Sequence, residues 1–176
     1  MTYCAFCRDL PEGSVHKVYH DTQYGVPLND DNELFGRLVL EINQAGLSWT
    51  TILNKQAAFR EAYAQFSIAR VAAFTESDRS RLLADAGIIR NRLKVNAAIE
   101  NARRLLVIQQ ELGSFQSWLQ LHQSSCPDRG AWTRLFKKTF LFIGGEIVNE
   151  FLMSSGLLPG AHEPTCPCFR PSTSLG

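Results

Sequence analysis

The 176-residue sequence lacks a long hydrophobic run: no stretch reaches the roughly 18 consecutive apolar residues that a membrane-spanning helix requires. Its start, Met-Thr-Tyr-Cys-Ala-Phe-Cys-Arg-Asp, also lacks the basic and apolar regions of a secretory signal. Internal repeats and low-complexity stretches are absent as well. We therefore expect a soluble protein of the cytoplasm that does not associate with membranes.

An excess of charge of either sign is also lacking. The 18 Lys and Arg residues nearly balance the 17 Asp and Glu residues, and the formal net charge is +1. A protein with this balance binds nucleic acid only if its basic residues are gathered on one face. The five cysteines are odd in number, which argues against a disulfide framework and favours free thiols or metal ligands.

Between about residues 30 and 156, apolar residues recur at intervals of three and four, which predicts helices. We expect helices at 31–45, capped by Asn29 or Asp30 and stopped by Gly46, and from 49 through Phe66 after the cap Ser48. Further helices are predicted at 71–74, at 78–84 after Thr75, at 91–112, from 114, from 132 and at 146–155. Residues 1–28 and 157–176 contain several prolines and are predicted to be loop-rich.

This pattern predicts an all-α protein with a single domain over residues 1–176. Within it we expect a helical lobe at about 31–156 and a terminal lobe made of residues 1–30 plus 157–170. Four of the five cysteines and three of the four histidines lie in the two tails.

These terminal residues are candidate zinc ligands, because a structural zinc site needs four nitrogen or sulfur donors and two tails with little core gain most from such a link. The candidates exceed four and are Cys4, Cys7, His16, His20, His162, Cys166 and Cys168. The spacings of the Cys4 and Cys7 pair and of the His162 and Cys166 pair are both acceptable for zinc. The residues alone therefore leave the set open, and buried free thiols with surface histidines are the alternative.

Glu41 is a second candidate functional residue. On the predicted helix it falls beside Leu34 and Leu38, at the border of the apolar stripe, where a carboxylate is costly without a partner. Gln44 and Trp49 follow across a tight turn, and a carboxylate, an amide and a flat aromatic ring would suit a planar base. The alternative is a glutamate that reaches water from the border of the stripe.

A third feature is the run from Lys137 and Lys138 to Gly144 and Gly145, where a glycine turn opens the last helix. Backbone amides at such a turn can bind a phosphate. A Gly-Gly turn is often only structural, and Glu146 counts against an anion. Arg90, Arg92 and Lys94 form a second basic cluster, with phosphate contact or a solvated face as its two interpretations.

Several runs in series resemble DNA-3-methyladenine glycosylase I. They are Tyr19-His20-Asp21 with Gly25-Val26-Pro27, Leu40-Glu41 with Gln44-Ala45-Gly46-Leu47-Ser48-Trp49, Asp85-Ala86-Gly87-Ile88-Ile89-Arg90, and Lys137-Lys138. Together with Cys4 and the ending His162-x3-Cys166, they cover nearly the whole chain in order.

The resemblance implies a helix-hairpin-helix DNA glycosylase fold with one structural Zn²⁺ that joins the N- and C-terminal segments. It assigns the ligands as Cys4, His20, His162 and Cys166, so Cys7 and Cys168 are left as bystanders or supporting groups. It makes Glu41 the pocket carboxylate that recognises the extruded adenine. The residues expected to bind the base are Tyr19 and Trp49, which would sandwich it, with Phe6, His16 and Gln44.

The implied activity is hydrolysis of the N-glycosidic bond of 3-methyladenine in alkylated double-stranded DNA, by base flipping and attack of water. Lys137, Lys138, Gly144 and Gly145 would hold DNA phosphates. No lysine stands where a strand-cleaving glycosylase would place its nucleophile, so a monofunctional enzyme is expected, working as a monomer in a bacterial-type cytoplasm, on the nucleoid.

The chain departs from the family pattern at several positions. His16 replaces a tyrosine, Tyr24 replaces a tryptophan, and Gly145, Glu146, Asn149 and Glu150 stand where a threonine and a tyrosine are usual. Two alternatives follow: a related glycosylase for a different alkylated base, and a zinc-stapled DNA-binding module without catalysis.

Overall fold

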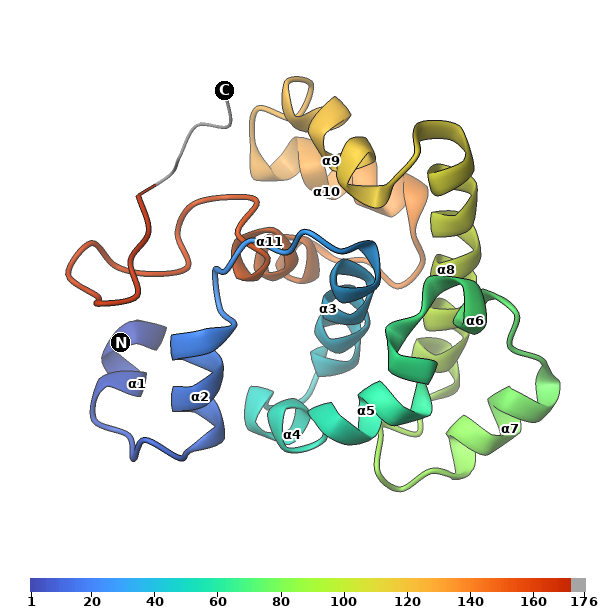
Figure 1. The fold of residues 1–176 in the computed structure, drawn as a ribbon, viewed down its shortest axis with the longest axis horizontal. Helices are drawn as coiled ribbons and strands as arrows, with labels where there is room; N and C mark the ends of the chain where they lie inside the picture. The colour runs from blue at the N-terminus through green and yellow to red at the C-terminus, as the bar shows by residue number, and fades with distance from the viewer. Residues whose placement is uncertain (172–176) are drawn as a thin grey trace.

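The computed structural model describes residues 1–171, which form an all-helical fold without strands (Figure 1). The elements are α1 Tyr3–Arg8, α2 Val15–Thr22, α3 Asp31–Gln44, α4 Trp49–Asn54, α5 Gln56–Ala62, the 3-10 turn η1 Ala64–Phe66, α6 Ile68–Ala72, α7 Glu76–Ala84, α8 Arg92–Leu112, α9 Phe115–Gln123, α10 Arg129–Thr139 and α11 Gly145–Ser154. The predicted all-α class is confirmed for this part of the chain. None of its helices is long and apolar enough to cross a membrane.

Local capping signals explain where most helices begin. Asp30 accepts a hydrogen bond from the Glu33 amide at the start of α3, and Asn91 accepts one from the Lys94 amide at the start of α8. Thr75 forms a capping box that opens α7. These helices therefore begin within one or two residues of the predicted positions.

Two predictions were wrong. The segment from Trp49 to Phe66 is not one helix, because α4, α5 and η1 divide it and residues 64 to 66 all have positive φ. This turn directs Phe66 onto Gly36 in the middle of α3, where a Cβ would come within 2.4 Å of the Phe66 ring. The loop-rich prediction for residues 1–28 also fails, because α1 and α2 form there, capped by Thr2 and Ser14.

The core surrounds α3 on nearly all sides. Every residue from Leu34 to Asn43 is buried, because α3 packs against α8, α11, α4 and the segment around η1. In Figure 1, α3 lies between α11 and α8. A polar residue in this stretch is therefore inside the protein whichever face of the helix it occupies, and Glu41 is one of them.

The N- and C-terminal segments lie side by side, at the left of Figure 1. The Gly25 amide donates to the Ser154 carbonyl at 2.9 Å. Gly25 and Gly156 both have positive φ, and a Cβ would come within 2.6 Å of Ala161 at Gly25 and within 2.7 Å of Pro27 at Gly156. The close approach of the two segments therefore requires glycine at both positions. The division into two lobes remains a prediction.

Candidate functional site

A cavity of about 790 Å³ lies between α2, α3, α4 and α11. Its lining combines three tyrosines and a tryptophan with three glutamates. The lining residues are Tyr3, Tyr19, Tyr24, Glu41, Gln44, Ala45, Gly46, Trp49, Gly144, Gly145, Glu146, Ile147, Asn149 and Glu150. A concave, aromatic site with a few polar groups is typical of a small-molecule or base-binding pocket.

Glu41 is the buried carboxylate of this cavity, with 5% of its surface exposed. The Ser154 hydroxyl donates to Glu41 Oε1 at 3.3 Å, which is a long hydrogen bond. Burial raises the pKa of Glu41 to about 8, against the opposing effect of the Arg37 guanidinium. With this pKa the carboxyl group is mostly protonated at neutral pH, and a cationic ligand would favour its ionised form.

Tyr19 and Trp49 form adjoining walls of the cavity. Their ring centroids are 5.2 Å apart and the rings meet at 69°, edge to face, as the charge distribution of aromatic rings favours. The predicted sandwich is therefore not formed by these two rings, which do not face each other across a slot. The Arg37 guanidinium lies over the Tyr19 ring at 5.4 Å.

Gln44 also lines the cavity, and its side-chain amide donates to the Leu47 carbonyl at 2.9 Å. Phe6 and His16 do not line it. The two imidazole nitrogens of His16 lie 3.0 Å from the Tyr3 hydroxyl and 2.7 Å from the Thr50 hydroxyl. His16 therefore contacts Tyr3, which lines the cavity, from outside.

The predicted phosphate-binding residues lie at the α10–α11 connection. Gly144 is the N-cap of α11, no side chain caps the amides of the first turn, and Gly144 and Gly145 also line the cavity. Lys137 and Lys138 are exposed in the last turn of α10. One end of the cavity thus meets a helix N-terminus with free amides.

A buried side chain fixes this connection. Asn101 on α8 is fully buried, accepts a hydrogen bond from the Leu141 amide at 2.8 Å and donates one to the Leu141 carbonyl at 3.1 Å. Arg104 donates to the Thr139 carbonyl at 2.9 Å. Together they attach the hairpin of residues 140–144 to the longest helix of the protein.

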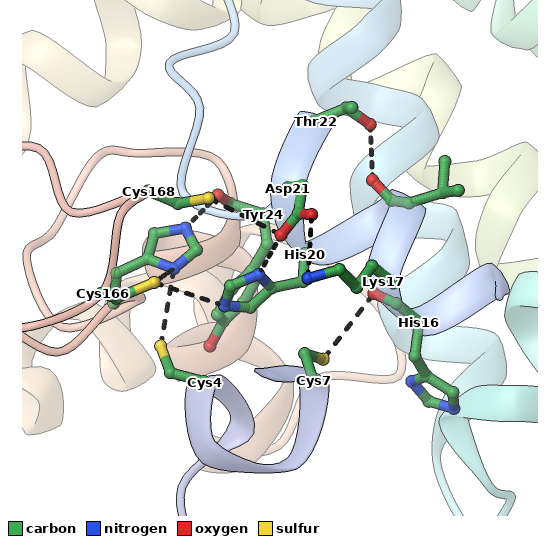
Figure 2. Close-up of polar contacts among 12 residues, drawn as sticks. Cys4, Cys7, His16, Lys17, His20, Asp21, Thr22, Tyr24, Cys166 and Cys168 are labelled. Carbon is green, nitrogen blue, oxygen red and sulfur yellow. Dashed lines mark hydrogen bonds and ion pairs between the residues drawn. The ribbon is translucent and has the colours of Figure 1, made fainter. Parts of the chain in front are cut away.

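Four side chains from the two ends of the chain meet in one cluster. The donor atoms of Cys4, His20, His162 and Cys166 all lie within 4.8 Å of one another. His162 Nδ1 is 3.6 Å from both thiol sulfurs, and His20 Nε2 is 3.7 Å from the Cys166 sulfur. Figure 2 shows Cys4, Cys166 and His20 pointing toward one another from α1, the C-terminal segment and α2.

These distances fit a tetrahedral zinc site. With Zn–S bonds of about 2.3 Å and Zn–N bonds of about 2.1 Å, a tetrahedron has S···N edges of about 3.6 Å. The remaining ring nitrogens also have partners, because His20 Nδ1 is 2.6 Å from Asp21 and His162 Nε2 is 2.8 Å from the Tyr24 carbonyl. Such contacts orient the lone pairs of metal-binding histidines toward the ion.

The other terminal cysteines lie outside this group of four. The Cys7 thiol is buried and points to the His16 carbonyl at 3.7 Å, away from the cluster (Figure 2). The Cys168 thiol is 3.6 Å from Asp21, which itself contacts His20. Cys168 is therefore a neighbour of the cluster.

Within the second basic cluster, Lys94 does not face a phosphate. It is 4% exposed, and its ammonium donates to the carbonyls of Asn43 and Ala45 at the end of α3. A cation at this position satisfies carbonyls that the helix leaves unpaired. Arg90 and Arg92 remain exposed.

Several cavity residues were not proposed for the site from the sequence, among them Tyr3, Tyr24 and Glu150. Asn101, which holds the hairpin, was not proposed either. Tyr3 stands one position before Cys4, and Asn101 stands on the apolar face of α8, which was a detectable signal. Glu150 is spaced four residues from Glu146, but only the packing of α11 on α3 shows that both line the cavity.

Comparisons with known proteins agree with this geometry. The profile of the family described as "Methyladenine glycosylase" matches residues 11–135. The DNA-3-methyladenine glycosylase 1 of Escherichia coli (strain K12) is 33% identical, over 93% of this chain and 96% of the relative. The DNA-3-methyladenine glycosylase of Haemophilus influenzae is also 33% identical, over 92% and 96%.

Two solved structures are similar to this chain in both fold and sequence. The structure of 3-methyladenine DNA glycosylase I from Staphylococcus aureus, described for its recognition of 3-methyladenine, gives a TM-score of 0.84 at 34% identity and covers 97% of both chains. A 3-methyladenine DNA glycosylase I variant in complex with 3-methyladenine gives 0.82 at 35% identity, covering 96% of this chain and 97% of that one. Fold and sequence agree, and the chain belongs to the methyladenine glycosylase family.

Proposed function

We propose that this protein is a monofunctional DNA glycosylase that hydrolyses the N-glycosidic bond of 3-methyladenine in alkylated double-stranded DNA. The observation that carries the proposal is Glu41, a carboxylate 5% exposed at a cavity walled by Tyr19 and Trp49. Burying a carboxylate without a strong partner destabilises the fold. Such a group is typical of a functional site, where a bound ligand supplies the missing partner. The Escherichia coli and Haemophilus influenzae relatives are both named as glycosylases of 3-methyladenine.

The chemistry follows from the charge of the substrate. Methylation at N3 makes adenine cationic, so the base is already a good leaving group and needs little help from a general acid. A flipped nucleotide whose ring stacks on Trp49 or Tyr19 presents this cation to the Glu41 carboxylate. The site thereby favours the extruded, positively charged base over a neutral one.

DNA phosphates would lie at the α10–α11 connection. The uncapped amides after Gly144 are suited to one phosphate, and Lys137 and Lys138 supply positive charge beside it. Few basic contacts are needed by an enzyme that scans DNA, which agrees with the net charge of +1.

We also propose one structural Zn²⁺ held by Cys4, His20, His162 and Cys166. The Cys₂His₂ donor set, the S···N separations near 3.6 Å and the partners of both outer ring nitrogens support it. The ion would link α1 and α2 to the C-terminal segment and so hold Tyr19, next to His20, against the cavity.

Asn149 and Glu150 favour a second candidate, a glycosylase for a different alkylated base. Both line the cavity, and Asn149 Oδ1 is buried without a hydrogen-bond partner. A buried acceptor of this kind is ready for a donor on a ligand. The assay below therefore records every base that is released.

The test uses duplex DNA treated with a methylating agent, with the released bases separated by chromatography. The wild type should release 3-methyladenine, and Glu41→Gln should reduce the rate by about a hundredfold, because the amide cannot hold the flipped, positively charged base in the cavity. Glu61→Gln, an exposed site on α5, is the matched control. Release of another alkylated base in place of 3-methyladenine would support the second candidate, and DNA binding without release would indicate a module that has lost catalysis.

We further propose that the protein acts as a monomer in the cytoplasm, where chromosomal DNA is accessible in a bacterial-type cell. Light scattering with and without a duplex oligonucleotide tests this, with one protein per DNA as the expected result.

A further inference from the structure

One face of α11 forms a wall of the cavity. Glu146, Glu150 and Ser154 are spaced four residues apart, so they lie on the same side of this helix. The Ser154 hydroxyl contacts Glu41, which places this end of α11 beside the deepest carboxylate. At 1.5 Å per residue, Glu150 lies about 6 Å closer to the Gly144 end of the helix.

The Glu150 carboxylate has no structural partner. It lines the cavity, and within residues 1–171 only charges at a distance act on it, without a hydrogen bond or an ion pair. Burial raises the pKa of Glu150, the Arg129 guanidinium on α10 lowers it, and the Glu146 carboxylate raises it. Its neighbour Asn149 likewise has a buried, unpaired Oδ1. This part of the wall is therefore free to contact a ligand.

The order of groups along α11 matches the order of parts in a nucleotide. Glu41, beside Ser154, is the proposed site for the base, and the amides after Gly144 are the proposed site for a phosphate. In a flipped nucleotide the sugar lies between base and phosphate. Glu150 lies between these two sites and lines the cavity, so the sugar of a flipped nucleotide would lie beside it.

We infer that Glu150 is a catalytic residue of this glycosylase, which holds the attacking water and opposes the positive charge that develops on the sugar. The inference rests on the proposed function and extends it, because Glu41 serves the base whereas Glu150 serves the reacting carbon. The two carboxylates belong to different helices, α3 and α11. The Glu150 charge also raises the pKa of Glu41, so the test measures base binding separately from base release.

The water oxygen bonds to C1′ of the sugar while the bond between C1′ and N9 of the base breaks. The bonding electron pair moves to the purine and neutralises its charge. One water proton passes to the Glu150 carboxylate and then to solvent. Water and the cationic nucleotide thus give an abasic sugar, neutral 3-methyladenine and one proton.

The experiment compares Glu150→Gln with Glu61→Gln, an exposed carboxylate on α5 outside the cavity. Single-turnover release of 3-methyladenine from methylated duplex DNA is measured at saturating enzyme. Binding of free 3-methyladenine is measured separately through the fluorescence of Trp49, which lines the cavity. Glu150→Gln should slow release by about tenfold or more while its affinity for the free base and for DNA stays within about twofold of wild type. Glu61→Gln should release the base at the wild-type rate.

Three results would overturn the inference. Release by Glu150→Gln at the wild-type rate removes the residue from the reaction and leaves the proposed function intact. A loss of rate matched by an equal loss of free-base affinity makes Glu150 a base-binding residue only. An equal loss in Glu61→Gln would show that the change in net charge alone slows release. If the wild type itself does not release 3-methyladenine, the proposed function is wrong. The inference about Glu150, which rests on that function, is then wrong as well.

Discussion

The terminal cluster and the cavity differ in how far their polar groups are satisfied. In the cluster, both nitrogens of His20 and His162 have a partner. In the cavity, Glu41 has one long hydrogen bond and Glu150 has none among the described residues. Buried polar groups are normally paired. The paired groups of the terminal cluster therefore indicate a structural role, whereas the unpaired groups of the cavity indicate a ligand-binding role.

The largest expected effect comes from breaking the cluster. Cys4→Ser removes a thiolate ligand of the proposed zinc ion, and we expect loss of the metal and of several kcal/mol of stability, because metal binding and folding of the two ends are coupled. Metal content per chain and thermal unfolding measure this. Cys7→Ser is the control, a buried thiol directed at the His16 carbonyl. Equal metal loss in both variants would contradict the assignment of the four ligands.

The second largest effect concerns Glu41, whose burial lowers the stability of the fold when the carboxylate is ionised. The pKa of Glu41 is raised from 4.5 to about 8, so the folded protein holds a proton that the unfolded chain releases between these values. Stability should therefore fall as pH rises from about 4.5 to 8, by at most about 1.4 kcal/mol per pH unit. Glu41→Gln should flatten this dependence in denaturant titrations and be more stable than wild type at pH 8. An unchanged pH dependence would mean that Glu41 is not the group responsible.

The same contrast shows what sequence can predict. Helix starts at Asp30 and Asn91 follow from local capping. The stripe border alone allows Glu41 either to be buried or to reach water, and its burial results from the packing of α3 on nearly all sides. The short α1 and α2 gave too few turns for a periodic signal. The left-handed turn that carries Phe66 depends on Gly36, some thirty residues away, and no local signal encodes that contact.

Site residues divide in the same way. Seven terminal Cys and His residues were candidate ligands, and which four meet depends on how two distant segments fold together. Glu41, Tyr19, Trp49 and Gln44 were predicted and do line the cavity. Glu150 faces the cavity only because α11 packs on α3, a contact more than one hundred residues apart in sequence.

A smaller effect is expected at the hairpin of residues 140–144. The buried side chain of Asn101 holds this hairpin, which leads into the proposed phosphate site. Asn101→Ala would leave the Leu141 amide and carbonyl unpaired, at a cost of about 1–3 kcal/mol. DNA affinity should fall several-fold while affinity for free 3-methyladenine is kept. Asn96→Ala on the same helix, which loses a hydrogen bond to Arg79, is the control. A loss of free-base binding in Asn101→Ala would show that the hairpin and the base site are not separable.

The smallest effect is expected at the exposed lysines, which are solvated rather than buried. Lys137→Ala and Lys138→Ala should each weaken DNA binding a few-fold, uniformly for methylated and unmethylated duplexes. Each should reduce the slope of log affinity against log salt by about one, because each removes one phosphate contact. Arg70→Ala, an exposed cation on α6, controls for net charge. If Arg70→Ala changes the slope equally, the effect comes from overall charge. The proposal that the α10–α11 connection binds a phosphate would then be wrong.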